Sequence, residues 1–417
     1  MRESLIKYAK PFDSVKDLNP LIEAIGDAKC VLLGESSHGT SEYYTIRAEL
    51  TKRLIQEKGF SIIAVEGDWP ACQSINRYIK GFTTVNQDVK RILEDFNRWP
   101  TWMWANEEII RLIEWLKEFN SKNDDLQQVG FYGLDVYSLW ESLDEIVRFL
   151  EKTHSPELET AKKAFACFEP HNRNNESYAV SAGYLSEDCM KEAFELLSTI
   201  RKNKWKFEDD QESSLNMEVN ALVTAHAEEY YRTMVKSDAD SWNIRDRHMV
   251  DALESIMHFY GDNAKVIIWE HNTHVGDARA TDMKDEGMVN VGQLVREKYG
   301  EDEVFIIGFG TYSGTVIAST KWGENFEVMN VPPAQTGSWE DLMHQTGAMN
   351  QYLLFNDYNR KEFSVTVGHR AIGVVYHPEY EHFGNYVPSN MGQRYDGFIF
   401  IDRTNALHPL IVEHVLI

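Results

Sequence analysis

The chain has few of the features that mark secreted or membrane-bound proteins. Only four of its 417 residues are cysteines, and none belongs to a C-x-x-C pair. No apolar run approaches the roughly 20 residues that span a bilayer, and the N-terminal segment lacks an apolar core with a small-residue cleavage site. These absences predict a cytoplasmic protein whose cysteines are buried free thiols (Cys30, Cys72, Cys167 and Cys189).

Positive charge is also scarce. Lysine and arginine number 42 against 66 aspartates and glutamates, which gives a formal net charge of −24. Nucleic acids and anionic membranes favour basic surfaces, so we expect neither as a partner. The net charge does not constrain a single pocket, whose local charge can be opposite.

Several catalytic signatures are missing. The stretch Gly310–Gly314 is offset by one residue from the G-x-S-x-G elbow of serine hydrolases. No G-x-x-x-x-G-K-[ST] loop occurs, the glycines from Gly308 onward miss the dinucleotide-binding spacing, and H-E-x-x-H is absent. A serine hydrolase, a nucleotide-driven enzyme and a nicotinamide enzyme are therefore all disfavoured.

What the chain does have is a carboxylate or an imidazole at the end of four apolar runs. The runs and the residues that follow them are 31–33 with Glu35 and His38, 62–65 with Glu66 and Asp68, 131–134 with Asp135, and 266–268 with His271 and His274. In α/β proteins, functional side chains gather where parallel strands end. This repetition is the main evidence in the sequence that the protein is an enzyme.

The alternation of strands and helices predicts an α/β fold with a mainly parallel central sheet flanked by helices. We expect one domain over residues 1–417, with a helical insertion at about 150–240. The expected strands are 30–33, 61–65, 129–134, a strand from 266, 304–309, 371–376 and 398–401. The expected helices include 41–58, 107–119, 215–235 and 244–260, and 169–177 is expected to be a loop at a hairpin tip.

Glu35 and His38 lie in a loop that Gly34 and Gly39 bracket. Small residues there let the backbone bend sharply and approach a ligand. Arg47 follows at helical spacing, on the face that should pack against the sheet, where a guanidinium is costly unless carboxylates meet it. Glu35 and Glu66 are the expected partners. The alternatives are a structural loop histidine and a buried ion pair without a chemical role.

His271 and His274 are three residues apart, a spacing that lets both imidazoles converge on one centre. A metal half-site completed by Glu35, Glu66 or His38 is one interpretation. A cluster of acid, base and orienting groups is the interpretation that we favour.

Two further segments have both structural and functional interpretations. The aromatic cluster of Phe96, Trp99, Trp102 and Trp104 either packs a helix on the sheet or forms the wall of a pocket for a large apolar substrate. The charged stretch 245–248 (Arg-Asp-Arg-His) is either functional or a solvated helix face.

These motifs together resemble the erythromycin esterase-like family, some of whose members are described as succinoglycan biosynthesis proteins. The resemblance rests on Gly34–Thr40 with Arg47, Val65–Asp68, Gly133–Asp135, Trp269–His274, Gly308–Tyr312 and Tyr395–Gly397. It spans nearly the whole chain and implies an α/β fold with helical hairpins beside a deep cleft.

The resemblance also implies metal-independent ester hydrolysis, in which His38 activates water. Glu35 and Glu66 would then orient His38 or the water, and Arg47 would hold the carboxylates or stabilise an oxyanion. His271 and His274 would polarise the carbonyl or protonate the leaving alcohol. The substrate-binding residues expected from these motifs and the aromatic cluster are Asp68, Trp69, Trp102, Asp135 and Tyr312.

We therefore predict a hydrolase that cleaves a carboxylic ester, such as a macrolide lactone, without a cofactor or a covalent intermediate. Such an activity would connect the protein with antibiotic resistance. One alternative is a metal-dependent hydrolase that uses His271 and His274, and the other is a non-catalytic protein that binds a small molecule. The sequence leaves the oligomeric state open.

Overall fold

The computed structural model describes residues 1–83, 88–123, 128–207 and 212–410. The chain divides into two compact units: Met1–Ile63, Ile79–Gly130 and Lys265–Ile417 form the first, and Ala64–Tyr78 with Phe131–Ala264 form the second. Strands β3 (Ile62–Asp68) and β4 (Gly130–Asp135) begin in the first unit and continue into the second.

The first unit is built on a sheet whose centre is parallel. Its strands follow the order β1-β8-β11-β6-β2-β5, and β7 pairs with β6 at its far end. The bounds are β1 (Lys10–Pro11), β2 (Cys30–Leu33), β5 (Val266–Trp269), β6 (Val304–Ala318), β7 (Glu327–Val331), β8 (Gln351–Leu354) and β11 (Gly397–Thr404). The pairs β5–β2, β2–β6 and β6–β11 are parallel, whereas β8 and β7 are antiparallel to their neighbours.

The central strands are fully buried, which explains their continuous apolar runs. Leu33 at the end of β2 lies opposite both Trp269 of β5 and Ile307 of β6. Because β2 and β5 are parallel and end at the same level, the loops after them begin side by side. This register brings the two strongest sequence motifs to one edge of the sheet.

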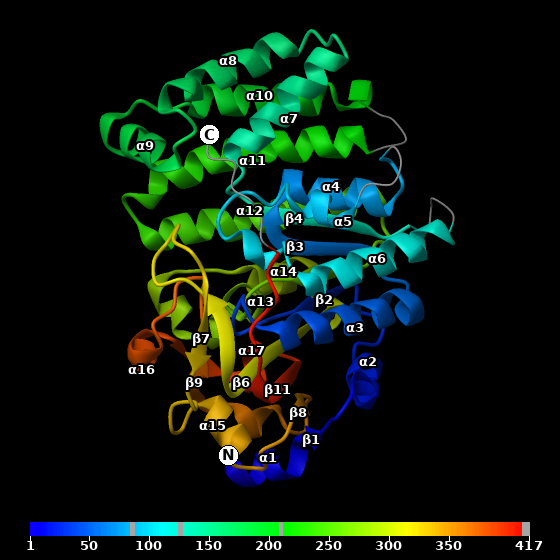
Figure 1. Cartoon of the computed structure of the whole chain (residues 1–417), viewed down its shortest axis with the longest axis vertical. Coiled ribbons are helices and arrows are strands. Elements are labelled where there is room, and N and C mark those ends of the chain that lie inside the picture. The colour runs from blue at the N-terminus through cyan, green and yellow to red at the C-terminus, as the bar shows by residue number, and fades with distance from the viewer. Residues whose placement is uncertain (84–87, 124–127, 208–211, 411–417) are drawn as a thin grey trace. The chain divides into compact units, whose positions relative to one another are not determined.

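Ten helices of the first unit surround this sheet in the part of the chain that the structure describes: α1 (Arg2–Tyr8), α2 (Asn19–Ala24), α3 (Ser41–Lys58), α5 (Val89–Leu93), α6 (Glu107–Ser121), α13 (Asn272–Val275), α14 (Val291–Tyr299), α15 (Trp339–His344), α16 (Glu381–Gly384) and α17 (Met391–Arg394). Figure 1 labels each of them. Helix α3 ends at Gly59, whose φ of 73° is left-handed and favours glycine. Helix α6 begins after Asn106, whose side chain accepts a hydrogen bond from the Ile109 amide at 2.8 Å.

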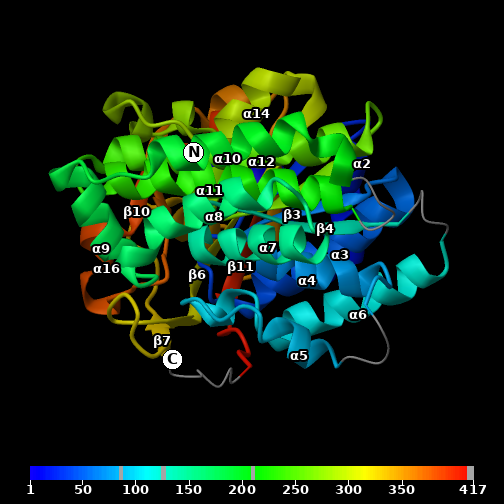
Figure 2. The same ribbon diagram turned by 90° about the horizontal axis from the view of Figure 1, so that it is seen from above.

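The second unit is mainly helical. Its helices are α4 (Trp69–Ile79), α7 (Leu139–Lys152), α8 (Leu158–Phe168), α9 (Asn175–Val180), α10 (Met190–Lys202), α11 (Ser213–Met234) and α12 (Asp238–Tyr260). Helix α11 lies between α7, α10 and α12 and contacts all three (Figure 2). It buries a polar stripe of Asn220, Thr224 and Glu228, spaced four residues apart, as well as its apolar residues.

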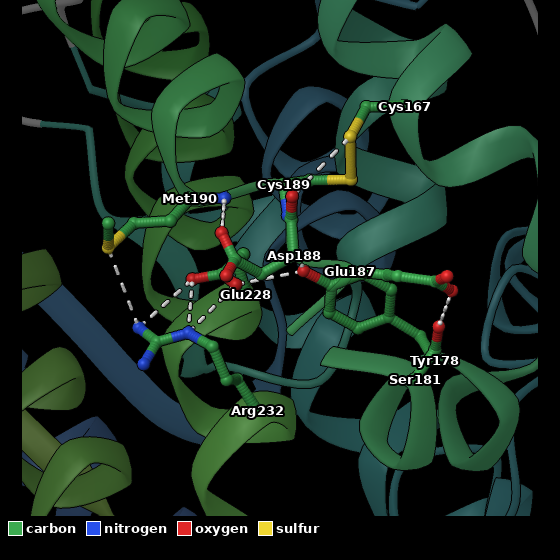
Figure 3. The surroundings of a disulfide bond; sticks show 9 residues. All are labelled: Cys167, Tyr178, Ser181, Glu187, Asp188, Cys189, Met190, Glu228 and Arg232. Carbon is green, nitrogen blue, oxygen red and sulfur yellow. Dashed lines mark hydrogen bonds and ion pairs between the residues drawn. A yellow bond between two sulfur atoms is a disulfide. The ribbon is translucent and has the colours of Figure 1, made fainter. Parts of the chain in front are cut away.

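The prediction of four free cysteines is wrong for two of them. Cys167 at the end of α8 and Cys189 just before α10 form a disulfide with a Cα separation of 5.9 Å, whereas Cys30 and Cys72 are buried and free. The Tyr178 hydroxyl accepts a hydrogen bond from the Cys189 amide at 2.9 Å and donates one to Glu228 at 2.8 Å (Figure 3). The expectation of a cytoplasmic protein rested in part on four free cysteines, and only Cys30 and Cys72 are free.

Most expected elements are confirmed, with corrections at a few boundaries. The strand at 30–33 and the helix at 41–58 have the predicted bounds. Strand β6 is longer than expected, and 371–376 is no strand but makes isolated bridges beside β9 (Thr366–Arg370), which pairs with β10 (Tyr386–Asn390). The expected loop at 169–177 contains the start of α9. Within the described ranges, the helices are too short or too polar for any of them to cross a membrane.

The disulfide closes a segment of 22 residues, so its loss should destabilise the fold by about 3 kcal/mol through chain entropy. We expect Cys167→Ser/Cys189→Ser to lower the denaturant midpoint measured by circular dichroism. Reductant should lower the midpoint of the wild type but not that of the double variant. Denatured wild type should show two reactive thiols before reduction and four after it; four thiols without reductant would contradict the bond.

Candidate functional site

The loops after β2 and β5 are tied together in the first unit. The Asn272 amide donates a hydrogen bond to the Glu35 carbonyl at 2.8 Å. A Cβ on Gly34 would lie 2.1 Å from Asn272 Oδ1, so no larger residue fits at that position. Gly34 is therefore required by close approach of the second loop, and the two motifs form one structure.

Glu35 is the centre of a buried cluster. Its side chain is 3% exposed. Glu35 Oε1 lies 2.9 Å from His38 Nδ1, and Oε2 accepts a hydrogen bond from Arg47 Nη2. A carboxylate only accepts hydrogen bonds, so the proton of neutral His38 is on Nδ1. Nε2 is then the nitrogen that carries the lone pair.

Arg47 extends from α3, and its side chain is 1% exposed. Its guanidinium carbon lies 4.8 Å from the centre of the Tyr44 ring and 4.6 Å from that of Trp269, and its Nε donates to the Tyr43 carbonyl at 3.3 Å. The prediction that a carboxylate meets Arg47 is confirmed for Glu35. Because the two rings enclose its guanidinium, Arg47 is better placed to hold Glu35 than to contact a substrate directly.

His271 lies beside His38, and the centres of their rings are 4.9 Å apart. It caps α13: His271 Nδ1 accepts from the Thr273 amide at 3.3 Å and lies 2.8 Å from the Thr273 hydroxyl. When His271 is neutral, its proton is therefore on Nε2, which is a donor. His274 lies one turn along α13 and is buried.

Asn272, which the sequence motifs include but to which they assign no role, positions this pair of loops. Its Nδ2 donates a hydrogen bond to the Phe309 carbonyl, and its Oδ1 accepts one from the Phe309 amide. The same Nδ2 lies 3.2 Å from His369 Nε2. His369 Nδ1 in turn lies 2.5 Å from Glu340 Oε1. Burial lowers the pKa of His369 despite Glu340. Burial alone would raise the pKa of Glu340, but His369 and Arg370 hold it below its usual value.

The second unit holds another carboxylate cluster at the ends of β3 and β4. Arg245 on α12 donates to Glu66 at 2.7 Å and binds both oxygens of Asp135 at 3.0 and 2.8 Å. Burial alone would lower the pKa of Arg245, but Asp135, Tyr137 and Glu66 raise it well above its ordinary value. Glu66 thus pairs with Arg245, a residue that the sequence did not single out as its partner. The interpretation of 245–248 as a solvated face holds only for Arg247, since Asp246 and His248 are buried and Arg245 is nearly so.

The remaining predicted residues lie in both units. Trp69, at the start of α4, is buried, stacks on Tyr132 and donates to Asn216 at 2.8 Å. Asp68 ends β3 in the same unit. Trp102, in the first unit, is 1% exposed, which favours its interpretation as core. Tyr312, on β6, stacks on His344 with a distance of 3.6 Å between the ring centres.

A pair of histidines in the second unit was missed by the sequence analysis. His226 and His248 approach with their Nδ1 atoms 3.0 Å apart. Burial, and secondarily the neighbouring His226, lower the pKa of His248 to about 3. Two imidazoles that are 22 residues apart and on different helices carry no local signal, because their approach depends on how α11 packs on α12.

Metal ligation by the histidine motif is one of the sequence interpretations. Within the described ranges, no group of three or more His, Cys, Asp and Glu side chains converges as a metal site requires. The cluster of Glu35, His38 and His271 instead has the pairing of an acid–base site: a carboxylate orients one imidazole, and a second imidazole lies beside it.

These features define an α/β protein with buried Glu–His and Glu–Arg pairs where its parallel strands end. The chain belongs to the erythromycin esterase family: the family profile described as Erythromycin esterase matches residues 55–404. The match includes His271 and His274 and begins after His38. Membership of this family supports hydrolase activity.

Two curated relatives cover most of the chain. YbfO of Bacillus subtilis (strain 168), provisionally described as a hydrolase, is 23% identical over 95% of this chain and 89% of its own length. Erythromycin esterase type II of Escherichia coli is 24% identical over 84% of this chain and 86% of its own.

Solved structures share the fold. A succinoglycan biosynthesis protein matches with a TM-score of 0.79 at 20% identity, covering 98% of this chain and 97% of its own. A Bacillus cereus protein matches with a TM-score of 0.80, also at 20% identity, covering 98% of both. A mutant of the erythromycin esterase EreC in its open conformation matches with a TM-score of 0.64 at 14% identity, covering 96% of both. At these identities the likeness shows the fold alone.

The buried Glu35–Arg47 pair predicts a strong coupling. Arg47→Met should lower the free energy of unfolding by about 3–5 kcal/mol, because it leaves a buried carboxylate without its cation. Adding Glu35→Gln to that variant should recover part of the loss. Denaturant unfolding of both single variants and the double variant measures this; additive effects would show that the pair is not coupled.

His248 predicts a loss of stability on acidification. Because its pKa is lower in the folded state than the ordinary 6.5, the unfolded chain binds the extra proton as the pH falls from about 7 toward 3. His248→Gln should therefore reduce the slope of unfolding free energy against pH, between pH 7 and 5, by up to about 1.4 kcal/mol per unit. An unchanged slope in that window would contradict the buried neutral state.

Proposed function

We propose that this protein hydrolyses a carboxylic ester by direct attack of water that His38 activates. The observation that carries the proposal is the hydrogen bond between Glu35 Oε1 and His38 Nδ1, 2.9 Å long and buried. It directs the basic nitrogen of His38 away from Glu35, as an orienting carboxylate does for a catalytic histidine. Family membership supports hydrolysis in general, and this geometry supports the more specific reaction.

In the proposed reaction, His38 Nε2 takes a proton from water while the water oxygen attacks the carbonyl carbon. Glu35 stabilises the imidazolium that forms, and Arg47 keeps Glu35 in place. The C–O bond of the tetrahedral intermediate then breaks, and the proton passes from His38 to the departing alcohol oxygen. One ester and one water become one acid and one alcohol, with no covalent enzyme intermediate.

His271 is proposed to stabilise the oxyanion of that intermediate. Its Nδ1 accepts from the Thr273 amide, so the neutral ring carries its proton on Nε2, and this N–H would donate to the oxyanion. A preorganised donor in a buried site contributes much of the stabilisation in acyl transfer. The roles of His274 and Glu66, and of Asp68, Trp69, Trp102, Asp135 and Tyr312 as substrate contacts, stay predictions.

A macrolide lactone is the specific substrate that we propose testing first. The Escherichia coli relative described as an erythromycin esterase supports this choice, at 24% identity. A lactone is a cyclic ester, so the reaction above opens its ring without a change in mechanism.

The decisive experiment is hydrolysis of p-nitrophenyl esters and a 14-membered macrolide by metal-stripped wild type, His38→Ala and His377→Ala. His377 is a half-exposed histidine away from the cluster and serves as the matched control. His38→Ala should lower kcat/KM by about 10²–10⁴-fold, the usual contribution of a general base, and His377→Ala should leave it unchanged.

Three results would overturn the proposal. Turnover retained by His38→Ala would remove His38 as the base. Activity that disappears on stripping and returns with zinc or manganese would favour the metal-dependent alternative, in which His271 and His274 hold the ion. Ligand binding without turnover of any ester would favour the non-catalytic alternative.

A further inference from the structure

The second unit contains a pocket of about 350 Å³, and its lining includes none of the proposed catalytic residues. Its walls come from three helices: α4 contributes Gln73 and Arg77, α7 contributes Arg148 and Lys152, and the first turn of α11 contributes Ser213. Its volume is within the usual range of small-molecule sites.

The pocket is basic in a strongly acidic chain. Among the lining residues that the structure describes, three are basic (Arg77, Arg148 and Lys152) and one is acidic, Glu145, which pairs with Arg148. The lining therefore carries a formal charge of +2, whereas the whole chain carries −24. Concentrating positive charge in one concave site favours a ligand with about two negative charges.

Gln73 points to a ligand independently of charge. The residue is 7% exposed, and its Nε2 has no hydrogen-bond partner among the residues that the structure describes. Within the described ranges, its Oε1 accepts one long hydrogen bond, from Asn76 at 3.5 Å. A buried amide nitrogen without a partner is destabilising, and a ligand oxygen in the pocket would satisfy it.

The start of α11 adds donors to the same pocket. The helix is 22 residues long, and its first residue, Ser213, lines the pocket together with Asn216. Amides at a helix N-terminus, with the helix dipole behind them, favour phosphate and similar anions. The preceding Glu212 does not line the pocket; its carboxylate accepts hydrogen bonds from Asn76 and Tyr132 at 2.8 and 3.0 Å.

We propose that this pocket binds a small phosphate monoester. The dianionic phosphate lies near Gln73, Ser213 and the basic side chains, which donate to its oxygens. Phe149 and Pro70, the apolar part of the lining, contact the organic group. Arginine and lysine bind phosphate as ionic donors, and the size of the pocket leaves room for more than the phosphate itself.

Binding is tested with two probes, inorganic phosphate and phenyl phosphate, by isothermal titration calorimetry on the full chain at constant ionic strength. Phenyl phosphate should bind saturably with one site per chain and more tightly than inorganic phosphate, because its ring contacts Phe149. Absence of saturable binding by either probe would overturn the proposal. Equal affinity for both would overturn the assignment of an organic group.

Gln73→Leu separates a ligand-binding role from a structural one. It removes the unpartnered amide, so the unfolding temperature of the free protein should stay the same or rise. Affinity for phenyl phosphate should fall by about tenfold or more, as expected for a lost hydrogen bond to a charged group. An unfolding temperature that falls while affinity is unchanged would mean that Gln73 is structural, and would contradict the proposal.

A pair of charge reversals tests the basic lining. Arg148→Glu/Lys152→Glu should weaken phenyl phosphate binding by more than about tenfold. The matched control, Lys162→Glu/Lys163→Glu on the exposed face of α8, changes the net charge equally outside the pocket and should change affinity less than about twofold. Equal losses in both variants would show a general charge effect and would overturn the site.

Discussion

The first unit depends on one buried carboxylate, Glu35, that accepts hydrogen bonds from two partners at once. Arg47 holds one oxygen, and His38 donates to the other. Removing a carboxylate from water is costly unless its charge is balanced and its oxygens are bonded. Both conditions are met here by residues of one loop and one helix. The orientation of His38 and the position of Arg47 between two rings both follow from that constraint.

The same physical solution recurs in the second unit with different elements. Glu66 and Asp135, at the ends of β3 and β4, share Arg245 from α12. In each unit, carboxylates at strand ends are balanced by an arginine from a helix that lies far away in sequence or packs against the sheet. The arginines do not take over the chemical role of the carboxylates. They make it possible to keep these groups buried and oriented.

The sequence predicted local secondary structure well. Strand β2 and helix α3 have the expected bounds, because four apolar residues in a row and a helical pattern that ends in glycine are signals contained in the segment itself. The pairing of Glu35 with Arg47 also followed, since a guanidinium on a packing face requires a nearby carboxylate. Strand β6 was predicted too short because its polar residues beyond Phe309 hide an extended segment that β7 and β11 pair with.

Tertiary packing decided the rest. Helices α11 and α12 bury polar residues such as Thr224 and His248. The contrast between their apolar and polar faces is therefore weak, and that contrast is what distinguishes buried from solvated residues in a sequence. The sequence therefore left open whether Arg245 is functional or part of a solvated face. The bond between Cys167 and Cys189 depends on how closely the ends of α8 and α10 approach, which no spacing motif encodes.

The hydrogen bond from the Asn272 amide to the Glu35 carbonyl, together with the lack of space at Gly34, has a consequence for the dynamics of the first unit. Opening of either loop breaks the backbone contact with the other. The amide protons of the two loops should then exchange with solvent as a single cooperative unit, with one opening free energy. Motion that admits or releases a molecule there must come from elements outside these loops.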